Sequence, residues 1–151
     1  MGDEVLFARD DELLSDLRRE LDSSSAEEVR IWALEMIRKP LCYLKGRYST
    51  VFGLSEFMDG DFDIDRKTAE TVWKKLLRSS AETEDTADRL TLEAAAAFLR
   101  AMWEKDRAID AMAALLTSII YQDGPEDGIR GVPIVVFAAE EVLQSIKKKI
   151  A

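Results

Sequence analysis

The chain has 151 residues, of which 47 % are apolar and 34 % are charged, and its net charge is −9. This length and this balance predict one globular helical domain, residues 1–151, with its own core, and they argue against disorder. An acidic surface repels phosphate backbones and anionic lipids, so we expect neither nucleic-acid nor membrane binding. Such a surface suits solubility, or a basic protein as partner.

Histidine is absent, and Cys42 is the only cysteine. The chain therefore lacks the commonest general base and transition-metal ligand, and it cannot form an intrachain disulfide. These absences exclude zinc fingers, Ser-His-Asp and Cys-His catalysis, and haem ligation through histidine. Any chemistry has to use carboxylates, Lys, Arg, Tyr or the single thiol. We interpret Cys42 itself as a small buried apolar side chain.

The N-terminal sequence has the pattern of neither a signal peptide nor a transit peptide. The longest apolar stretches are interrupted by Arg100 and Asp110, far short of a membrane span. We therefore expect a cytoplasmic protein.

The first segments have helical patterns with clear start signals. Residues 10–22 carry an apolar stripe, and Ser25 with Glu28 forms a capping box that opens a second helix, through residue 37. Pro40 ends this helix or begins the next.

Residues 41–58 are harder to assign, because they are apolar and aromatic but contain two glycines. We predict helix there, in one or two pieces. Asp65 is a suitable N-cap for the next helix, whose apolar positions run from Ala69 to Leu77. Residues 79–88 are polar and acidic, which predicts a loop or a short solvated helix.

Thr91 is predicted to open a helix over residues 92–105. The alanines at 94–97 have no bulk, so a neighbouring helix can approach closely there. Apolar residues 108–121 form a further helix, which either continues the previous one or follows a turn near Asp106.

Residues 122–131 contain three glycines and a proline, which predicts the clearest loop of the chain. Pro133 fits the first turn of a last helix, residues 132–150. The apolar side chains predicted to face inward from it are Phe137, Val142, Leu143 and Ile146. Residues 134–137 are also compatible with a strand, but we prefer helix because no second convincing strand pairs with them. The predicted fold class is therefore all-α, a single-domain bundle of five to seven helices.

One loop has the spacing of a metal site. Read as a twelve-residue calcium loop over residues 59–70, it places carboxylates at positions 1, 3, 5 and 12, namely Asp59, Asp61, Asp63 and Glu70. Ile64 stands where such loops need glycine, and Arg66 stands where they carry an apolar residue. The alternative is a solvated acidic loop whose Asp65 caps the next helix.

A magnesium-dependent hydrolase is the second possible use of carboxylates. The EExxE pattern of all-helical nucleotide pyrophosphohydrolases is not matched, since Ile31 and Gln144 stand where the third acid should follow the two Glu-Glu pairs. The three tryptophans, Trp32, Trp73 and Trp103, lie on apolar helical faces. Core packing explains them better than a binding hot spot does.

The sequence therefore predicts a non-enzymatic helical protein-interaction module: an adaptor, regulator or inhibitor that needs no cofactor. Its partner is expected to be a protein, and a basic one would suit the charge. A second copy of the same chain is the alternative partner, which would make the protein a homo-oligomer. The rival hypothesis is a carboxylate-based metal protein, either Ca²⁺ binding at 59–70 or Mg²⁺-dependent hydrolysis.

Overall fold

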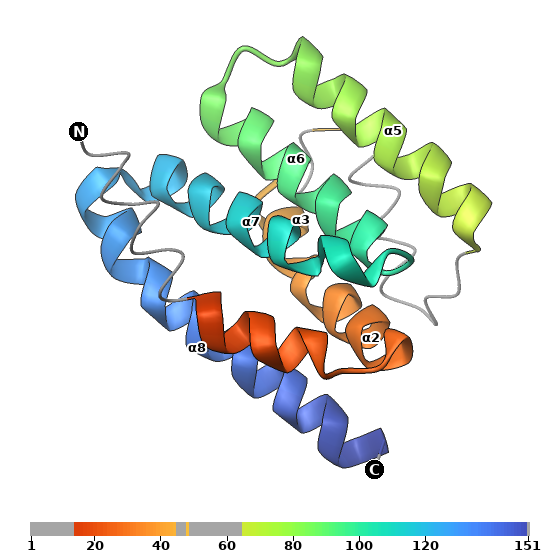
Figure 1. Ribbon diagram of the computed structural model, residues 1–151. Coiled ribbons are helices and arrows are strands. Elements are labelled where there is room, and N and C mark those ends of the chain that lie inside the picture. The colour runs from red at the N-terminus through yellow and green to blue at the C-terminus, as the bar shows by residue number, and fades with distance from the viewer. Residues whose placement is uncertain (1–13, 45–47, 49–64, 151) are drawn as a thin grey trace.

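A computed structural model of the chain describes residues 14–44, 48 and 65–150, and its regular structure is helical throughout that part. A helical segment at 14–22 precedes the labelled elements. These are α2 (Ala26–Met36), α3 (Arg38–Leu44), α5 (Arg66–Glu82), α6 (Thr86–Ala101), the short 3₁₀ helix η1 (Lys105–Arg107), α7 (Ala108–Asp123) and α8 (Pro125–Ile150). The all-α helical bundle is confirmed (Figure 1).

The predicted start signals of α2 and α5 are both present. The backbone N–H of Glu28 donates to Oγ of Ser25 at 3.1 Å, and the N–H of Ser25 donates to the Glu28 carboxylate at 2.7 Å. The latter bond lowers the pKa of Glu28 below its usual value. Asp65 accepts a hydrogen bond from the backbone N–H of Thr68 at 2.7 Å. In both cases a side chain satisfies N–H groups that the helix cannot pair internally.

A break does lie within the predicted range 79–88, but it is confined to residues 83–85, and the predicted helix start at Thr91 is wrong. Helix α5 continues to Glu82, and α6 begins at Thr86, because Asp85 caps it by accepting from the N–H of Asp88 at 2.9 Å. Thr91 lies inside α6, fully buried, and its hydroxyl donates to the carbonyl of Ala87 at 2.6 Å. A threonine bonded back to its own helix tolerates a buried interior position, so it need not mark an end.

Helix α6 is the centre of the bundle and lies between α5 and α7 (Figure 1). Its alanines at 94–96 are buried, which allows the neighbouring helices to approach closely, as predicted. Phe98 meets Trp32 of α2 edge to face, with ring centroids 5.7 Å apart. The Trp32 indole N–H donates to the carbonyl of Ala139 in α8 at 3.1 Å. The core therefore joins α2, α6 and α8 through one aromatic cluster.

The loop predicted at 122–131 is wrong. Only Gly124, with φ of 88°, breaks the helical path, and α8 begins directly at Pro125. Gly128 lies within α8 against α7, where a Cβ would come closer than 3.0 Å to the Cα of Ile120. This glycine is required by a close helix crossing, which looks the same in sequence as a turn. Pro133 accordingly lies inside α8 and not in its first turn.

The helical segment at 14–22 is attached to the bundle through its C-terminal end. The Lys147 ammonium of α8 donates to the Glu20 carboxylate at 3.0 Å and to the Glu20 carbonyl at 3.1 Å. Lys105 donates to the carbonyl of Asp22 at 3.0 Å and also to that of Ser24. Two lysines distant in sequence therefore satisfy carbonyls at the negative end of this helix. Within the described residues, no helix is long and apolar enough to cross a membrane.

Candidate interaction surface

The predicted calcium ligands fall mostly outside the described residues. This holds for Asp59, Asp61 and Asp63. Of the predicted helix 41–58, residues 41–44 lie in α3, Tyr48 is described and is not helical, and the other residues lie outside the described part. Glu70 lies on α5, where its carboxylate pairs with the Arg66 guanidinium at 3.5 Å. Among the residues that the structure describes, no group of three or more His, Cys, Asp or Glu side chains is placed to hold a metal ion.

Two further sequence interpretations are resolved by burial. Cys42 is exposed on α3, so its interpretation as a buried side chain is wrong. Trp32 and Trp73 are buried in the core, as predicted. Trp103 is partly buried, and the Arg30 guanidinium lies 4.0 Å above its ring. The tryptophans therefore stabilise the fold and do not form an exposed binding surface.

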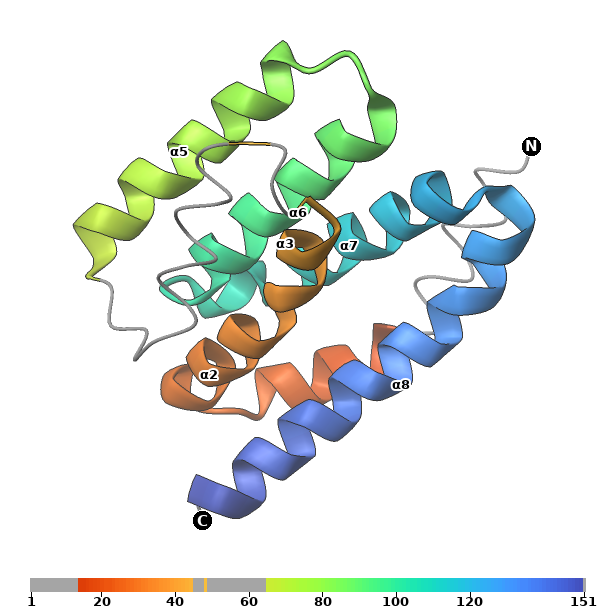
Figure 2. The ribbon, with the colours of Figure 1, turned by 180° about the vertical axis from the view of Figure 1, so that it is seen from behind.

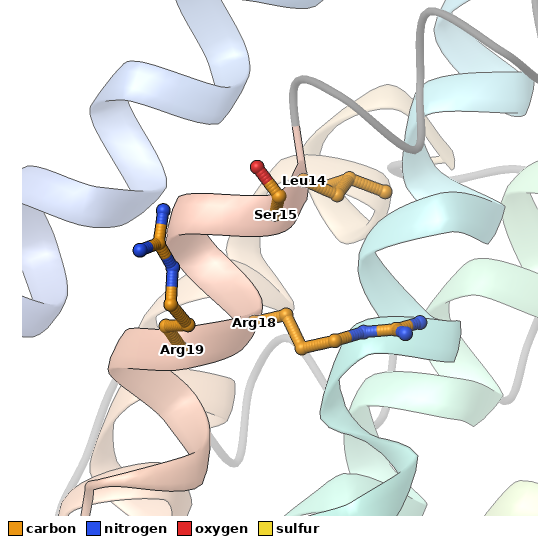
Figure 3. A pocket seen from close by; sticks show the side chains of 4 residues that line it. All are labelled: Leu14, Ser15, Arg18 and Arg19. Carbon is orange, nitrogen blue, oxygen red and sulfur yellow. The ribbon is translucent and has the colours of Figure 1, made fainter.

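A hollow of about 430 Å³ lies beside the helical segment 14–22, lined by Leu14, Ser15, Arg18 and Arg19. Two neighbouring arginines suggest an anion site, but their side chains leave the helix on opposite sides (Figure 3). Arg19 is moreover paired with Asp16. The two guanidinium groups do not converge on one ligand.

A second hollow of about 440 Å³ lies between segment 14–22 and α8, and it includes Asp16, Glu20 and Glu140. Burial raises the pKa of Glu140, and the charges of Asp16 and Glu20 raise it further. Arg19 lines the same hollow, and Lys147 pairs with Glu20. The carboxylates are partly neutralised by the protein's own cations, so the hollow is part of the helix contact.

A smaller hollow of about 160 Å³ lies between α5, α6 and α7, against Trp73 and Ala96. Its charged rim is already paired: Arg100 binds Glu104 at 2.6 Å, and Arg107 lies 3.8 Å from Asp110. The Arg100 hydrogen bond lowers the pKa of Glu104. These ion pairs hold the junction of α6 and α7 together, and Glu93, which also lines the hollow, accepts a hydrogen bond from the Ser80 hydroxyl at 3.2 Å.

Helix α8 presents two opposite faces. The inner face is a regularly spaced apolar stripe that is buried against the bundle: Val132, Val136, Ala139, Leu143 and Ile146. At about 100° per residue, Ile134 and Phe137 lie on the other side of the helix. The structure leaves Ile134 70 % exposed and Phe137 58 % exposed. The prediction that Phe137 faces inward is therefore wrong, whereas that for Leu143 and Ile146 is confirmed.

Charged side chains continue this exposed side in both directions along α8. Arg130 lies one turn before Ile134, and Glu141 lies one turn after Phe137. All four positions fall within a sector of about 60°. In the described part of the chain, no ion pair joins Arg130 or Glu141 to another side chain. We call the side formed by Arg130, Ile134, Phe137 and Glu141 the outer face of α8.

Helix α8 runs along the edge of the bundle, and no drawn helix passes over it in the view from behind (Figure 2). An aromatic and a branched aliphatic side chain three residues apart on a helix form one apolar patch. The helical periodicity of the buried stripe would have placed Ile134 and Phe137 on the opposite side in the sequence. That stripe lies wholly within the predicted helix 132–150, and the patch was missed because Phe137 was assigned to the inward face. No family model, curated protein or solved structure matches this chain.

Proposed function

We propose that this protein is a helical protein-interaction module whose binding surface is the outer face of α8. The observation that carries the proposal is the exposure of Ile134 and Phe137 next to each other on a helix whose opposite face is buried in the core. Aromatic side chains backed by rigid structure are typical binding hot spots, because they lose little conformational freedom on binding.

We infer the partner's chemistry from the order of residues along the outer face. A single helix face with apolar residues at i and i+3 fits another helix that carries a matching apolar pair. The cation at one end and the anion at the other favour a partner with an acidic residue beside Arg130 and a basic residue beside Glu141. The partner element is therefore an amphipathic helix with charge of both signs, and not a uniformly basic surface.

The energetics are those of a modest contact. Covering an apolar side chain fully contributes about 1.5–3 kcal/mol, and here only the exposed parts of two side chains remain to be covered. A patch of this size alone supports reversible association, which suits an adaptor or a regulator.

Photo-crosslinking tests the proposal. Benzoylphenylalanine replaces Phe137 in the full-length chain, and the crosslinking is done inside the cells that produce the protein. The matched control carries benzoylphenylalanine in place of the exposed Lys75 on α5. We expect a discrete adduct from position 137 that is lost when Ile134→Ser or Arg130→Glu is added. An adduct with this chain itself or with another protein supports the proposal. Absence of any adduct, or the same adducts from the control position, would overturn it.

A further inference from the structure

We propose that the helix which binds the outer face of α8 is the α8 of a second copy of this chain, packed antiparallel across a twofold axis. This inference rests on the proposed function and names its partner. The occupant is argued from the order of charged and apolar residues along the outer face.

The outer face is complementary to itself when reversed. In an antiparallel pair centred between Ile134 and Phe137, Ile134 of one copy meets Phe137 of the other, and the same contact occurs twice. At a rise of 1.5 Å per residue, Arg130 and Glu141 lie about 8 Å on either side of that centre. Arg130 of each copy therefore lies beside Glu141 of the other. A twofold interface requires this reciprocal pairing of different residues.

A parallel pairing lacks this match, because it places Arg130 against Arg130 and Glu141 against Glu141. Like charges in contact across an interface oppose binding. The charges of the outer face thus select one orientation, while the apolar pair supplies the buried contact. Neither charged side chain is engaged in an ion pair within the described part of the chain. Both remain available for this use.

Analytical ultracentrifugation of the full-length protein is the first test. We expect the average mass to rise with concentration from 17.1 kDa towards twice that value. Arg130→Glu and Glu141→Arg should each weaken association about tenfold, because like charges then meet at both ends of the contact. The control Lys74→Glu, at an exposed position of α5, should leave association unchanged.

Mixing the two weakened variants is the decisive test. In the antiparallel pair, a chain with Glu at both positions faces a chain with Arg at both, so both charge contacts, 130 with 141 and 141 with 130, join opposite signs. We expect the mixture to associate at least as tightly as the unsubstituted protein, although each variant alone is weakened. Circular dichroism confirms that each variant is folded.

Three results would overturn the inference: a monomer up to about 1 mM, single variants that associate normally, or a mixture that associates no better than its components. A monomer that still gives a specific crosslink from position 137 to another protein would overturn the self-association alone. Loss of every crosslink would remove the proposed function as well.

Discussion

The contact between α7 and α8 at Gly128 allows a sharp test of the fold. A Cβ added at Gly128 would come closer than 3.0 Å to the Cα of Ile120 and would lie 3.0 Å from its carbonyl oxygen. Carbon atoms normally approach to about 3.5–4.0 Å, so the two helices would have to separate. The obstacle is backbone, and no change of side-chain rotamer can relieve it.

Gly131 is the matched control, one turn further along the same helix. The nearest atom to a Cβ there is Cγ2 of Ile119 at 4.0 Å, which is ordinary contact. Both substitutions to alanine gain about 1 kcal/mol of helix propensity. Gly128→Ala also carries an overpacking cost of about 1–3 kcal/mol, and a backbone clash belongs at the upper end of that range. We expect Gly128→Ala to destabilise the protein by about 1–2 kcal/mol and Gly131→Ala to stabilise it by about 1 kcal/mol.

Urea unfolding followed by circular dichroism measures both free energies of unfolding. For a domain of this size, 1 kcal/mol corresponds to about 2–4 °C in Tm, so a thermal melt separates the two variants by several degrees. Equal stabilities of the two variants would refute the close crossing of α7 and α8 at Gly128. A stabilising effect at both positions would instead favour the exposed glycine loop that the sequence suggests.

Three further predictions concern individual side chains. The raised pKa of Glu140 means that its charged form destabilises the fold, fully above that pKa and not at all below the ordinary value of 4.5. Glu140→Gln should therefore raise Tm at neutral pH and have no effect at about pH 3, and an equal effect at both pH values would contradict this cause. Millimolar Ca²⁺ should leave Tm unchanged, because Glu70 is held by an arginine of its own helix, and a rise in Tm would establish the calcium loop. Exposed Cys42 should react with a thiol reagent in the native protein within about tenfold of the unfolded rate, whereas strong protection would show that it is covered.

Local signals in the sequence were sufficient for helix starts that depend on one side chain. The capping box at Ser25 and the cap at Asp65 are short-range interactions, so residue type and spacing determine them. Asp85 caps α6 in the same way, but Thr83, Thr86 and Asp88 close by are also residue types that cap helices. Gly124 and Gly128 could not be told apart in the sequence, because the same residue type serves a turn at Gly124 and a helix crossing at Gly128. Only the path of α7 distinguishes these two uses.

The candidate site follows from the observed burial along α8. Its buried apolar positions form a single stripe from Val132 to Ile146, and Phe137 falls outside that stripe. The predicted calcium residues Asp59, Asp61 and Asp63 lie outside the described chain, so that hypothesis stays a prediction. The proposed partner depends on the order of charges around Phe137, and that order has meaning only once Phe137 is known to be exposed.

The two faces of α8 are expected to contribute in opposite ways to stability. Truncating Leu143, which is fully buried, removes packed contacts and should cost about 2–5 kcal/mol. Phe137 and Ile134 are mostly in water, so replacing them with serine should change stability by no more than about 0.5 kcal/mol. Folding therefore accounts for the apolar residues of the inner face and not for those of the outer face. The proposal that the outer face binds a partner accounts for the latter, because an exposed aromatic beside an exposed isoleucine gains free energy only when another surface covers both.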